Sequence, residues 1–340
     1  MRVFRDLSAL TREARGGPSR PRVATVGYFD GLHVGHQKLL GELSAWTREI
    51  GGESAVVTFD RHPLEILEGR RPLKVLSLAH RLLLLERQGV EVVLLLEFTR
   101  ELSTWSPEDF ATKVFRDALG ARHILMGFDA ALGHERRGTF EYLSSRAGAL
   151  GIVVRRASVE VLGGERVSST IVRKAIQAGD LPALEKVLAR RFSLLGRVVR
   201  GDGRGRSIGF PTANLDLEGA ALVPGGVYFA EVTRLGRPSG PESLPRCGGA
   251  QRLPAVVNVG TCPTFGKGGA ADTVEVHIPD FHGDLYGEYL EVHFLLRHRE
   301  ERKFPSAALL VDQIRADVDA CREFLAGVPR QLPADTQRQV

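Results

Sequence analysis

Short apolar segments alternate with helix-like segments over the first half of this 340-residue chain. The apolar segments are residues 22–27, 55–59, 90–97, 123–126 and 152–155. Segments of helical periodicity separate them at residues 36–49, 79–88, 107–119 and 139–150. Strands that alternate with helices form a parallel sheet with right-handed crossovers. We therefore expect a doubly wound, Rossmann-like α/β domain.

The pattern changes near residue 180, where a short helix is followed by strand-like segments. These are residues 194–199, 226–233, 254–259, 273–278 and 289–295, joined by Gly- and Pro-rich connections. Such spacing predicts a small antiparallel β-barrel, and residues 309–325 read as an amphipathic closing helix. We expect domains at residues 1–185 and 186–327 and a mobile tail at 328–340. Residues 234–253 are expected to form a loose insertion.

Composition narrows the class of protein. No apolar stretch approaches the roughly 20 residues of a spanning helix, and the first residues lack the apolar core of a signal peptide. Three widely spaced cysteines form no CxxC pair. We therefore predict a cytoplasmic protein with no membrane partner. The net charge of +5 is spread without a Lys/Arg block, which favours anionic small molecules over nucleic acid as partners.

The segment Gly27–His36, GYFDGLHVGH, follows the first predicted strand and opens the first predicted helix. Free N–H groups at a helix start favour phosphate, and Gly35 allows close backbone approach. His33 and His36 are three residues apart and could donate hydrogen bonds to a phosphate in the transition state. The alternatives are ordinary surface histidines beside a capped helix, or a metal-binding pair for which no third ligand is evident.

This segment resembles the HxGH signature of nucleotidyltransferases and, in its longer form, the adenylyltransferase half of the bacterial bifunctional riboflavin kinase/FAD synthetase family. Residues 58–63 (TFDRHP) and 167–173 (VSSTIVR) resemble two further family segments, with Arg61 where the family usually has Pro. The resemblance implies catalytic roles for His33 and His36. It implies nucleotide contacts for Gly27, Phe29, Asp30, Gly35, Asp129, Ser168, Ser169, Thr170 and Arg173. It implies flavin contacts for Asp60, His62 and Pro63.

Residues 127–138 (GFDAALGHERRG) resemble a family segment that usually reads G-x-D/N-F-x-F-G-x-x-R-x-G. Asp129, Gly133, Arg136 and Gly138 fit this pattern. Ala130 and Leu132 stand where aromatic residues usually lie, and an aromatic ring supplies a large contact area. We therefore expect a looser or altered adenylyl-transfer pocket.

A basic, Gly-rich segment occupies residues 196–214 in the second half and ends in GFPTAN. It is no Walker A loop, and taken alone it fits either a phosphate-wrapping loop or a β-turn with solvated charges. It resembles the flavokinase motif, which implies nucleotide contacts for Gly203, Gly205, Arg206, Gly209, Pro211 and Asn214. The resemblance also implies that Thr212 and Asn214 hold Mg²⁺, a cation that prefers oxygen ligands.

Residues 274–278 (VEVHI) resemble the strand of that family which carries its general base, and this implies that role for Glu275. The resemblance also assigns Arg297 to the flavin. Residues 258–265 (NVGTCPTF) match a further motif, with Cys262 in place of Arg. Arg252 or Lys267 could compensate for that missing cation.

Together these motifs predict one chain with two active sites. The barrel would phosphorylate riboflavin with ATP to give FMN, and the α/β domain would transfer AMP from ATP to FMN, giving FAD and pyrophosphate. Mg²⁺ is the expected cofactor and ATP the co-substrate, and the chain is expected to be a monomer or a weak homo-oligomer. The alternatives are a riboflavin kinase with a weakened adenylyltransferase site, or a flavin-binding regulator without turnover.

Overall fold

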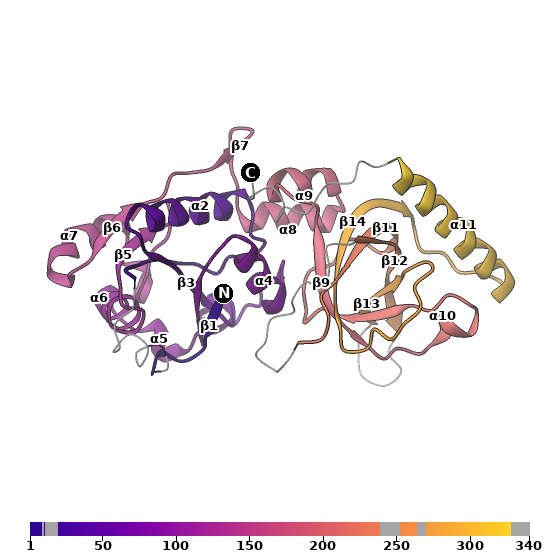
Figure 1. The fold of residues 1–340 in the computed structure, drawn as a ribbon, viewed down its shortest axis with the longest axis horizontal. Coiled ribbons are helices and arrows are strands. Elements are labelled where there is room, and N and C mark those ends of the chain that lie inside the picture. The colour runs from indigo at the N-terminus through magenta and orange to yellow at the C-terminus, as the bar shows by residue number, and fades with distance from the viewer. Residues whose placement is uncertain (9, 11–19, 239–251, 264–269, 328–340) are drawn as a thin grey trace. The chain divides into compact units, whose positions relative to one another are not determined.

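The computed structural model describes residues 1–8, 10, 20–238, 252–263 and 270–327 (Figure 1). The chain forms two compact units. The first combines Met1–Pro72 with Leu84–Ser168, and the second combines Leu73–Leu83 with Ser169–Val340. The predicted tail and most of the predicted insertion lie outside the described residues. Within the described part, no helix is both long enough and apolar enough to cross a membrane.

The first unit is built on a six-stranded parallel sheet with the order β1-β4-β3-β2-β5-β6. Its strands are β1 (Arg2–Phe4), β2 (Arg22–Val26), β3 (Glu53–Phe59), β4 (Val92–Leu96), β5 (Ala121–Met126) and β6 (Val153–Arg156). Every residue of β3 and β4 is buried, as expected for central strands of a parallel sheet. The predicted Rossmann-like fold is therefore confirmed, and β1 is a strand that the pattern analysis missed.

Helices lie on opposite sides of this sheet, as α2 and α6 show in Figure 1. The helical elements are α2 (Val34–Glu49), α3 (Pro63–Leu67), α4 (Leu78–Arg87), α5 (Arg100–Ser103), α6 (Pro107–Phe110), the π-helix η1 (Ala111–Ala118), the 3₁₀ helix η2 (His134–Arg136) and α7 (Phe140–Leu150). A small hairpin, β7 (Val161–Leu162) and β8 (Glu165–Arg166), follows β6. The helix predicted at 107–119 is thus a short α-helix that continues as a π-helix.

The second unit contains a closed antiparallel barrel with the order β10-β13-β12-β11-β14-β9. Its strands are β9 (Ser193–Val199), β10 (Ala213–Asp216), β11 (Gly226–Arg234), β12 (Arg252–Pro263), β13 (Ala270–His277) and β14 (Tyr289–Arg299). Its helices are α8 (Ser169–Ala178), α9 (Leu181–Leu188), α10 (Arg204–Ser207) and α11 (Ala307–Ala326). Val318 and Cys321 of α11 pack with Phe229 and Val256 of the barrel. The predicted barrel with a closing helix is confirmed.

A segment from the first half of the sequence is part of the second unit. Lys74 forms a parallel bridge with Ala220, and the Ala221 N–H donates to the Lys74 carbonyl at 2.6 Å. Leu83 packs with Leu195 and Leu235 in a buried cluster. The loop that connects α3 to α4 therefore leads directly from one compact unit into the other.

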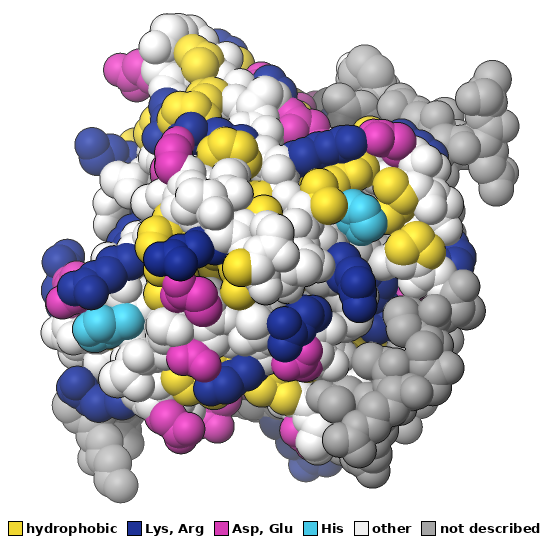
Figure 2. Space-filling model, turned by 90° about the vertical axis from the view of Figure 1, so that its left-hand side faces the viewer, with side chains coloured by type: hydrophobic (Ala, Val, Ile, Leu, Met, Phe, Trp, Pro, Cys, Tyr) yellow, Lys and Arg dark blue, Asp and Glu magenta, His cyan; other side chains and the backbone are white. Residues whose placement is uncertain are grey.

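The described charges are mixed in sign on the surface. In Figure 2, Lys and Arg side chains are interspersed with Asp and Glu across the visible face. Ion pairs among the described residues include Arg155 with Glu49 and Arg156 with Glu141. The excess of positive charge is thus distributed rather than gathered on the visible face.

Candidate active sites

The turn between β2 and α2 has an unusual backbone. Phe29, Gly31 and Leu32 have φ values of 57°, 86° and 41°. Non-glycine residues rarely adopt positive φ, and such strain is concentrated at functional sites. Phe29 and Leu32 are 1% exposed, so buried side chains fix the turn. Asp30 within the turn is also buried.

This turn brings the predicted histidines together at the start of α2. The His33 and His36 rings stack with centroids 3.8 Å apart, and the Phe29 ring lies 5.2 Å from His36. Burial, with a smaller contribution from His33, holds the pKa of His36 well below its usual value. His36 is therefore a neutral imidazole near pH 7, suited to hydrogen bonding. A Cβ on Gly35 would lie 3.2 Å from His33 Nδ1, so glycine leaves room for that ring.

The predicted flavin-contacting segment lies beside the same turn. The Thr58 hydroxyl donates to the Tyr28 carbonyl at 3.4 Å, and the His62 ring centroid is 4.6 Å from that of Tyr28. His62 Nδ1 accepts the Leu64 N–H at 3.2 Å and caps α3, which Pro63 begins. Asp60 accepts the N–H groups of Arg61 and Phe98. Two of the predicted motifs thus converge at the carboxyl ends of β2 and β3.

Asp129 follows β5 and forms an ion pair with Arg166 of β8 at 2.6 Å. Its own carbonyl accepts a hydrogen bond from Arg136 at 2.8 Å. Leu132, at a position where the family usually has an aromatic residue, is only 5% exposed and belongs to the core. Sequence reasoning missed Arg166, although this residue directly precedes the predicted nucleotide-binding segment at 167–173.

The segment at 167–173 crosses the boundary between the two units. Val167 and Ser168 belong to the first unit, and the Val167 carbonyl lies 3.9 Å from the Cβ position of Gly35. Ser169, Thr170 and Arg173 belong to the second unit and form the start of α8. Thr170 is exposed, and Arg173 donates to the Leu73 carbonyl at 2.7 Å. Their contact with a nucleotide stays a prediction.

The second candidate site lies on β10 and β13 of the barrel. Asn214 pairs with Glu275 in the antiparallel register, and Asn258 of β12 pairs with Glu275 on its other side. Burial raises the pKa of Glu275, while a hydrogen bond from Thr212 and the nearby Arg204 guanidinium act in the opposite direction. The structure therefore brings Glu275, Thr212 and Asn214 together, as predicted from separate motifs.

The basic loop before β10 folds tightly on itself. Gly203 and Gly209 have φ values of 72° and 88°, which open and follow the short helix α10. A Cβ on Gly205 would lie 2.3 Å from the Phe210 carbonyl oxygen, so this close backbone approach requires glycine. The Pro211 carbonyl is 2.9 Å from His277 Nδ1 of β13.

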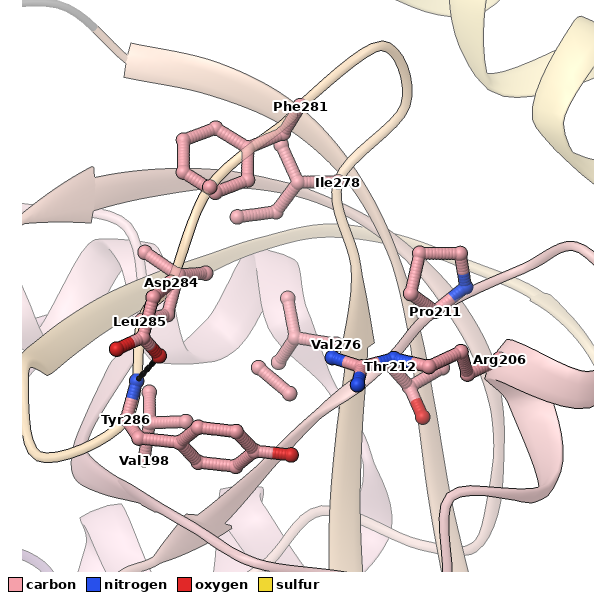
Figure 3. Close-up of a pocket in the computed structure, with 12 residues that line it drawn as sticks. Val198, Arg206, Pro211, Thr212, Val276, Ile278, Phe281, Asp284, Leu285 and Tyr286 are labelled. Carbon is pink, nitrogen blue, oxygen red and sulfur yellow. Dashed lines mark hydrogen bonds between the residues drawn. The ribbon is translucent and has the colours of Figure 1, made fainter.

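A pocket adjoins this loop (Figure 3). Its lining is Val198, Arg206, Pro211, Thr212, Ala213, Val276, Ile278, Phe281, Gly283, Asp284, Leu285 and Tyr286. Figure 3 shows the Tyr286 ring extending into the pocket, with its hydroxyl toward the side that carries Thr212 and Arg206. The Asp284 carboxylate accepts the Tyr286 N–H at 2.9 Å and orders this loop. A pocket that combines apolar side chains with Arg206 and Thr212 suits a planar base attached to a phosphate chain.

The apolar lining residues Val198 and Val276 are not among the predicted site residues. Val198 and Val276 alternate with outward-facing residues of their strands, a pattern that core residues share. Arg297, predicted to contact the flavin, is not among the lining residues and donates to the Gly225 carbonyl at 2.6 Å. Arg252, a predicted substitute for the missing cation, is paired with Glu231. The Cys262 side chain and Lys267 lie outside what the structure describes.

Comparisons with known proteins match both halves of the chain. The FAD synthetase family matches residues 17–171, and the riboflavin kinase family matches residues 188–325. A bifunctional riboflavin kinase/FMN adenylyltransferase from Pseudomonas fluorescens is 37% identical, over 96% of this chain and 98% of its own length. A protein of the same description from Escherichia coli K12 is 33% identical, over 95% of this chain and 98% of its own length. One from Bacillus subtilis is 32% identical, over 89% of this chain and 92% of its own length.

A solved structure shares the fold over nearly the whole chain. It is described as a macrolide-efflux protein from Streptococcus pneumoniae and is 32% identical, with a TM-score of 0.74. It covers 94% of this chain and 98% of its own. Its description does not alter the assignment that both halves of the sequence support. The chain belongs to the bifunctional riboflavin kinase/FMN adenylyltransferase family.

Proposed function

We propose that this chain phosphorylates riboflavin to FMN in its barrel unit and adenylylates FMN to FAD in its α/β unit, using ATP in both reactions. By the predicted domains, the first activity is assigned to residues 186–327 and the second to residues 1–185, of which Leu73–Leu83 and residues 169–185 pack with the barrel unit. The observation that carries it is the presence of a separate polar constellation in each unit, Glu275 beside Thr212 and Asn214 in one and the His33–His36 pair in the other.

In the kinase reaction, Glu275 accepts the proton of the riboflavin hydroxyl that attacks the γ-phosphate of ATP. Its raised pKa makes this carboxylate a better base than an exposed one. The pocket beside Tyr286 takes the adenine, and Arg206 in its lining faces the phosphates. The Gly-rich loop and Arg204 supply further N–H groups and charge for positioning.

The donor set at this site fits Mg²⁺. Thr212 and Asn214 offer oxygen ligands, and the described residues contain no cluster of three His, Cys, Asp or Glu able to hold a resident metal. Two neutral oxygen ligands from the protein suit Mg²⁺, because this hard cation also binds substrate phosphates and water. Mg²⁺ bound there would neutralise phosphate charge. Thr212 would then both contact the cation and hold Glu275 in place by its hydrogen bond.

In the adenylyl-transfer reaction, the phosphate of FMN attacks the α-phosphate of ATP and pyrophosphate leaves. No protein nucleophile is needed, so positioning and charge stabilisation account for the catalysis. His33 and His36 donate hydrogen bonds to the α-phosphate as its charge grows, and Gly27, Phe29, Asp30 and Gly35 shape the turn that holds them. Asp129, Arg166 and Ser168 contact the nucleotide. The sequence resemblance alone assigns phosphate contacts to Ser169, Thr170 and Arg173.

The flavin contacts are assigned to Asp60, His62 and Pro63 in the first unit and to Arg297 in the second. The nucleotide contacts in the barrel are assigned to Gly203, Gly205, Gly209, Pro211 and Asn214, together with Arg206. The enzyme is proposed to act in the cytoplasm, as a monomer or a weak homo-oligomer. A kinase-only reading is not favoured, because the FAD synthetase family matches residues 17–171 of this chain.

Product analysis tests this function. The purified chain is incubated with riboflavin, ATP and Mg²⁺, and riboflavin, FMN and FAD are separated by chromatography over time. FMN followed by FAD is expected. FMN alone would contradict the adenylyl-transfer assignment, and no product from riboflavin or from added FMN would contradict both assignments.

A further inference from the structure

The aromatic ring of Phe128 is held in an exposed position at the first site. Phe128 is 41% exposed, and it is the second residue after β5. Its neighbour Asp129 forms the ion pair with Arg166. Leu132 of the same loop is buried and Ala130 is small, so neither offers a ring surface to a ligand. An exposed aromatic ring in a candidate site needs a reason, since burying it would stabilise the fold.

Two arginines fix this ring from different strands. The Arg156 guanidinium carbon, at the end of β6, lies 4.5 Å from the Phe128 ring centroid, and its Nη2 donates to the Phe128 carbonyl at 3.0 Å. Glu141 pairs with Arg156 at 2.8 Å and holds it there. The Arg166 guanidinium carbon lies 5.1 Å from the same centroid. The residue is therefore anchored at its backbone, has a guanidinium over its ring from each of two strands, and still remains 41% exposed.

The topology indicates which substrate this ring would meet. In an open parallel sheet, ligands bind at the carboxyl ends of the strands, where the strand order reverses. In this sheet the reversal lies between β2 and β5, because β3 and β4 continue on one side of β2 and β5 and β6 on the other. Phe128 follows β5, whereas the predicted flavin contacts Asp60 and His62 follow β3. The ring thus lies across the switch point from the predicted flavin contacts.

We infer that Phe128 is the stacking platform for the adenine of ATP in adenylyl transfer. The inference deepens the proposed function and rests on it. A planar purine lies against the exposed part of the ring, and Arg156 keeps the ring in place. Arg166 is near both Phe128 and Asp129, so the same loop can contact the base and the charged part of the nucleotide. Phe128 is a binding and specificity residue, which contacts substrate without taking part in bond making.

The test compares KM and kcat for both activities in the same purified chains. Base stacking on an aromatic side chain changes binding by about tenfold. For Phe128→Ala we expect KM for ATP in FAD formation to rise about tenfold with kcat nearly unchanged. Phe128→Tyr should restore the wild-type KM. KM for ATP in FMN formation should not change, because that reaction uses the other unit.

Val153→Ala is the matched control, since Val153 is an apolar residue of β6 that is 49% exposed and outside the proposed site. It should leave both KM values unchanged. An unchanged KM for ATP in Phe128→Ala would overturn the inference. A rise in KM for FMN alone would overturn it too, since the ring would then serve the flavin.

A binding measurement separates this inference from the proposed function. In Phe128→Trp, ATP should quench the fluorescence of the added indole. The wild-type chain, which has two native tryptophans, supplies the background signal to subtract. Quenching in a chain that makes no FAD would support the platform while contradicting adenylyl transfer. Normal FAD formation without quenching would contradict the platform alone.

Discussion

His80 Nε2 lies 3.4 Å from Glu291 Oε1, and both side chains are 1% exposed. His80 belongs to the segment Leu73–Leu83, which comes from the first half of the sequence but is part of the barrel unit. Ser193 donates to the same Glu291 oxygen at 3.0 Å, and His293 Nε2 lies 3.7 Å from the other oxygen. A buried carboxylate thus joins this segment to β9 and β14, so the barrel unit includes residues outside the riboflavin kinase match at 188–325.

Replacing His80 should destabilise the barrel unit. Removing one partner of a buried polar pair leaves the other poorly compensated, and we expect His80→Ala to cost about 1–3 kcal/mol. The measurement is thermal inactivation of FMN formation, whose midpoint should fall. His134→Ala is the matched control, because the His134 side chain is 51% exposed beside Glu135. Equal midpoints for the two variants would show that the buried pair contributes nothing.

Glu275→Gln should abolish FMN formation while sparing FAD formation from added FMN. The amide keeps the shape of the side chain but cannot accept a proton, and loss of a general base costs about 10²- to 10⁴-fold in rate. Both rates are measured on one preparation. Glu323→Gln controls for a change of charge, since Glu323 is exposed on helix α11. Loss of both activities in folded Glu275→Gln would refute the division into two sites.

The pH dependence of FMN formation should follow the Glu275 carboxylate. The ionised form is the active base, so kcat/KM should rise with pH through the pKa of this group. Because burial raises that pKa, the acid limb should lie above the usual range of a glutamate. Thr212→Val removes a hydrogen bond that favours the ionised form, and should move the limb to still higher pH. A limb that stays in place in Thr212→Val would show that another group titrates.

The fold class was predictable because the two halves carry different periodicities. The apolar segments at 55–59 and 90–97 became the central strands β3 and β4, whose residues are buried on both faces. Periodicity could not reveal the π-helix at Ala111–Ala118, since its residues also fit an α-helix over such a short span. It also could not place the segment Leu73–Leu83, because membership in a unit depends on long-range packing.

The sites were predictable only in part, for a related reason. Motifs indicate residues whose chemistry is visible in the sequence, such as His36 or Glu275. Arg166 gains a candidate role only from Asp129, which the fold places beside it. Such neighbours are brought together by the fold and carry no local signal.

His36→Ala should produce the opposite pattern to Glu275→Gln. FAD formation from added FMN should fall about 10²- to 10³-fold, as for loss of a donor to a developing charge, while FMN formation persists. Because burial holds the pKa of His36 well below its usual value, the imidazole stays neutral as pH falls toward 6. FAD formation in the wild-type chain should therefore show no loss from protonation of His36 between pH 7 and about 6. If such a loss is absent in His36→Ala but present in the wild type, the assigned pKa direction is wrong.

Gly205→Ala tests whether the tight loop before β10 positions ATP for the kinase reaction. The new Cβ would lie 2.3 Å from the Phe210 carbonyl oxygen, so the backbone must move and Arg206 and Thr212 must move with it. We expect KM for ATP in FMN formation to rise at least about tenfold, since small displacements at a positioning loop are costly. FAD formation from added FMN should not change.

Gly41→Ala is the control, because its Cβ meets nothing within 4 Å in helix α2. That substitution should stabilise the chain by about 0.5–1 kcal/mol without affecting either KM. Equal KM values in the two variants would show that the close approach of Gly205 to Phe210 has no part in binding ATP.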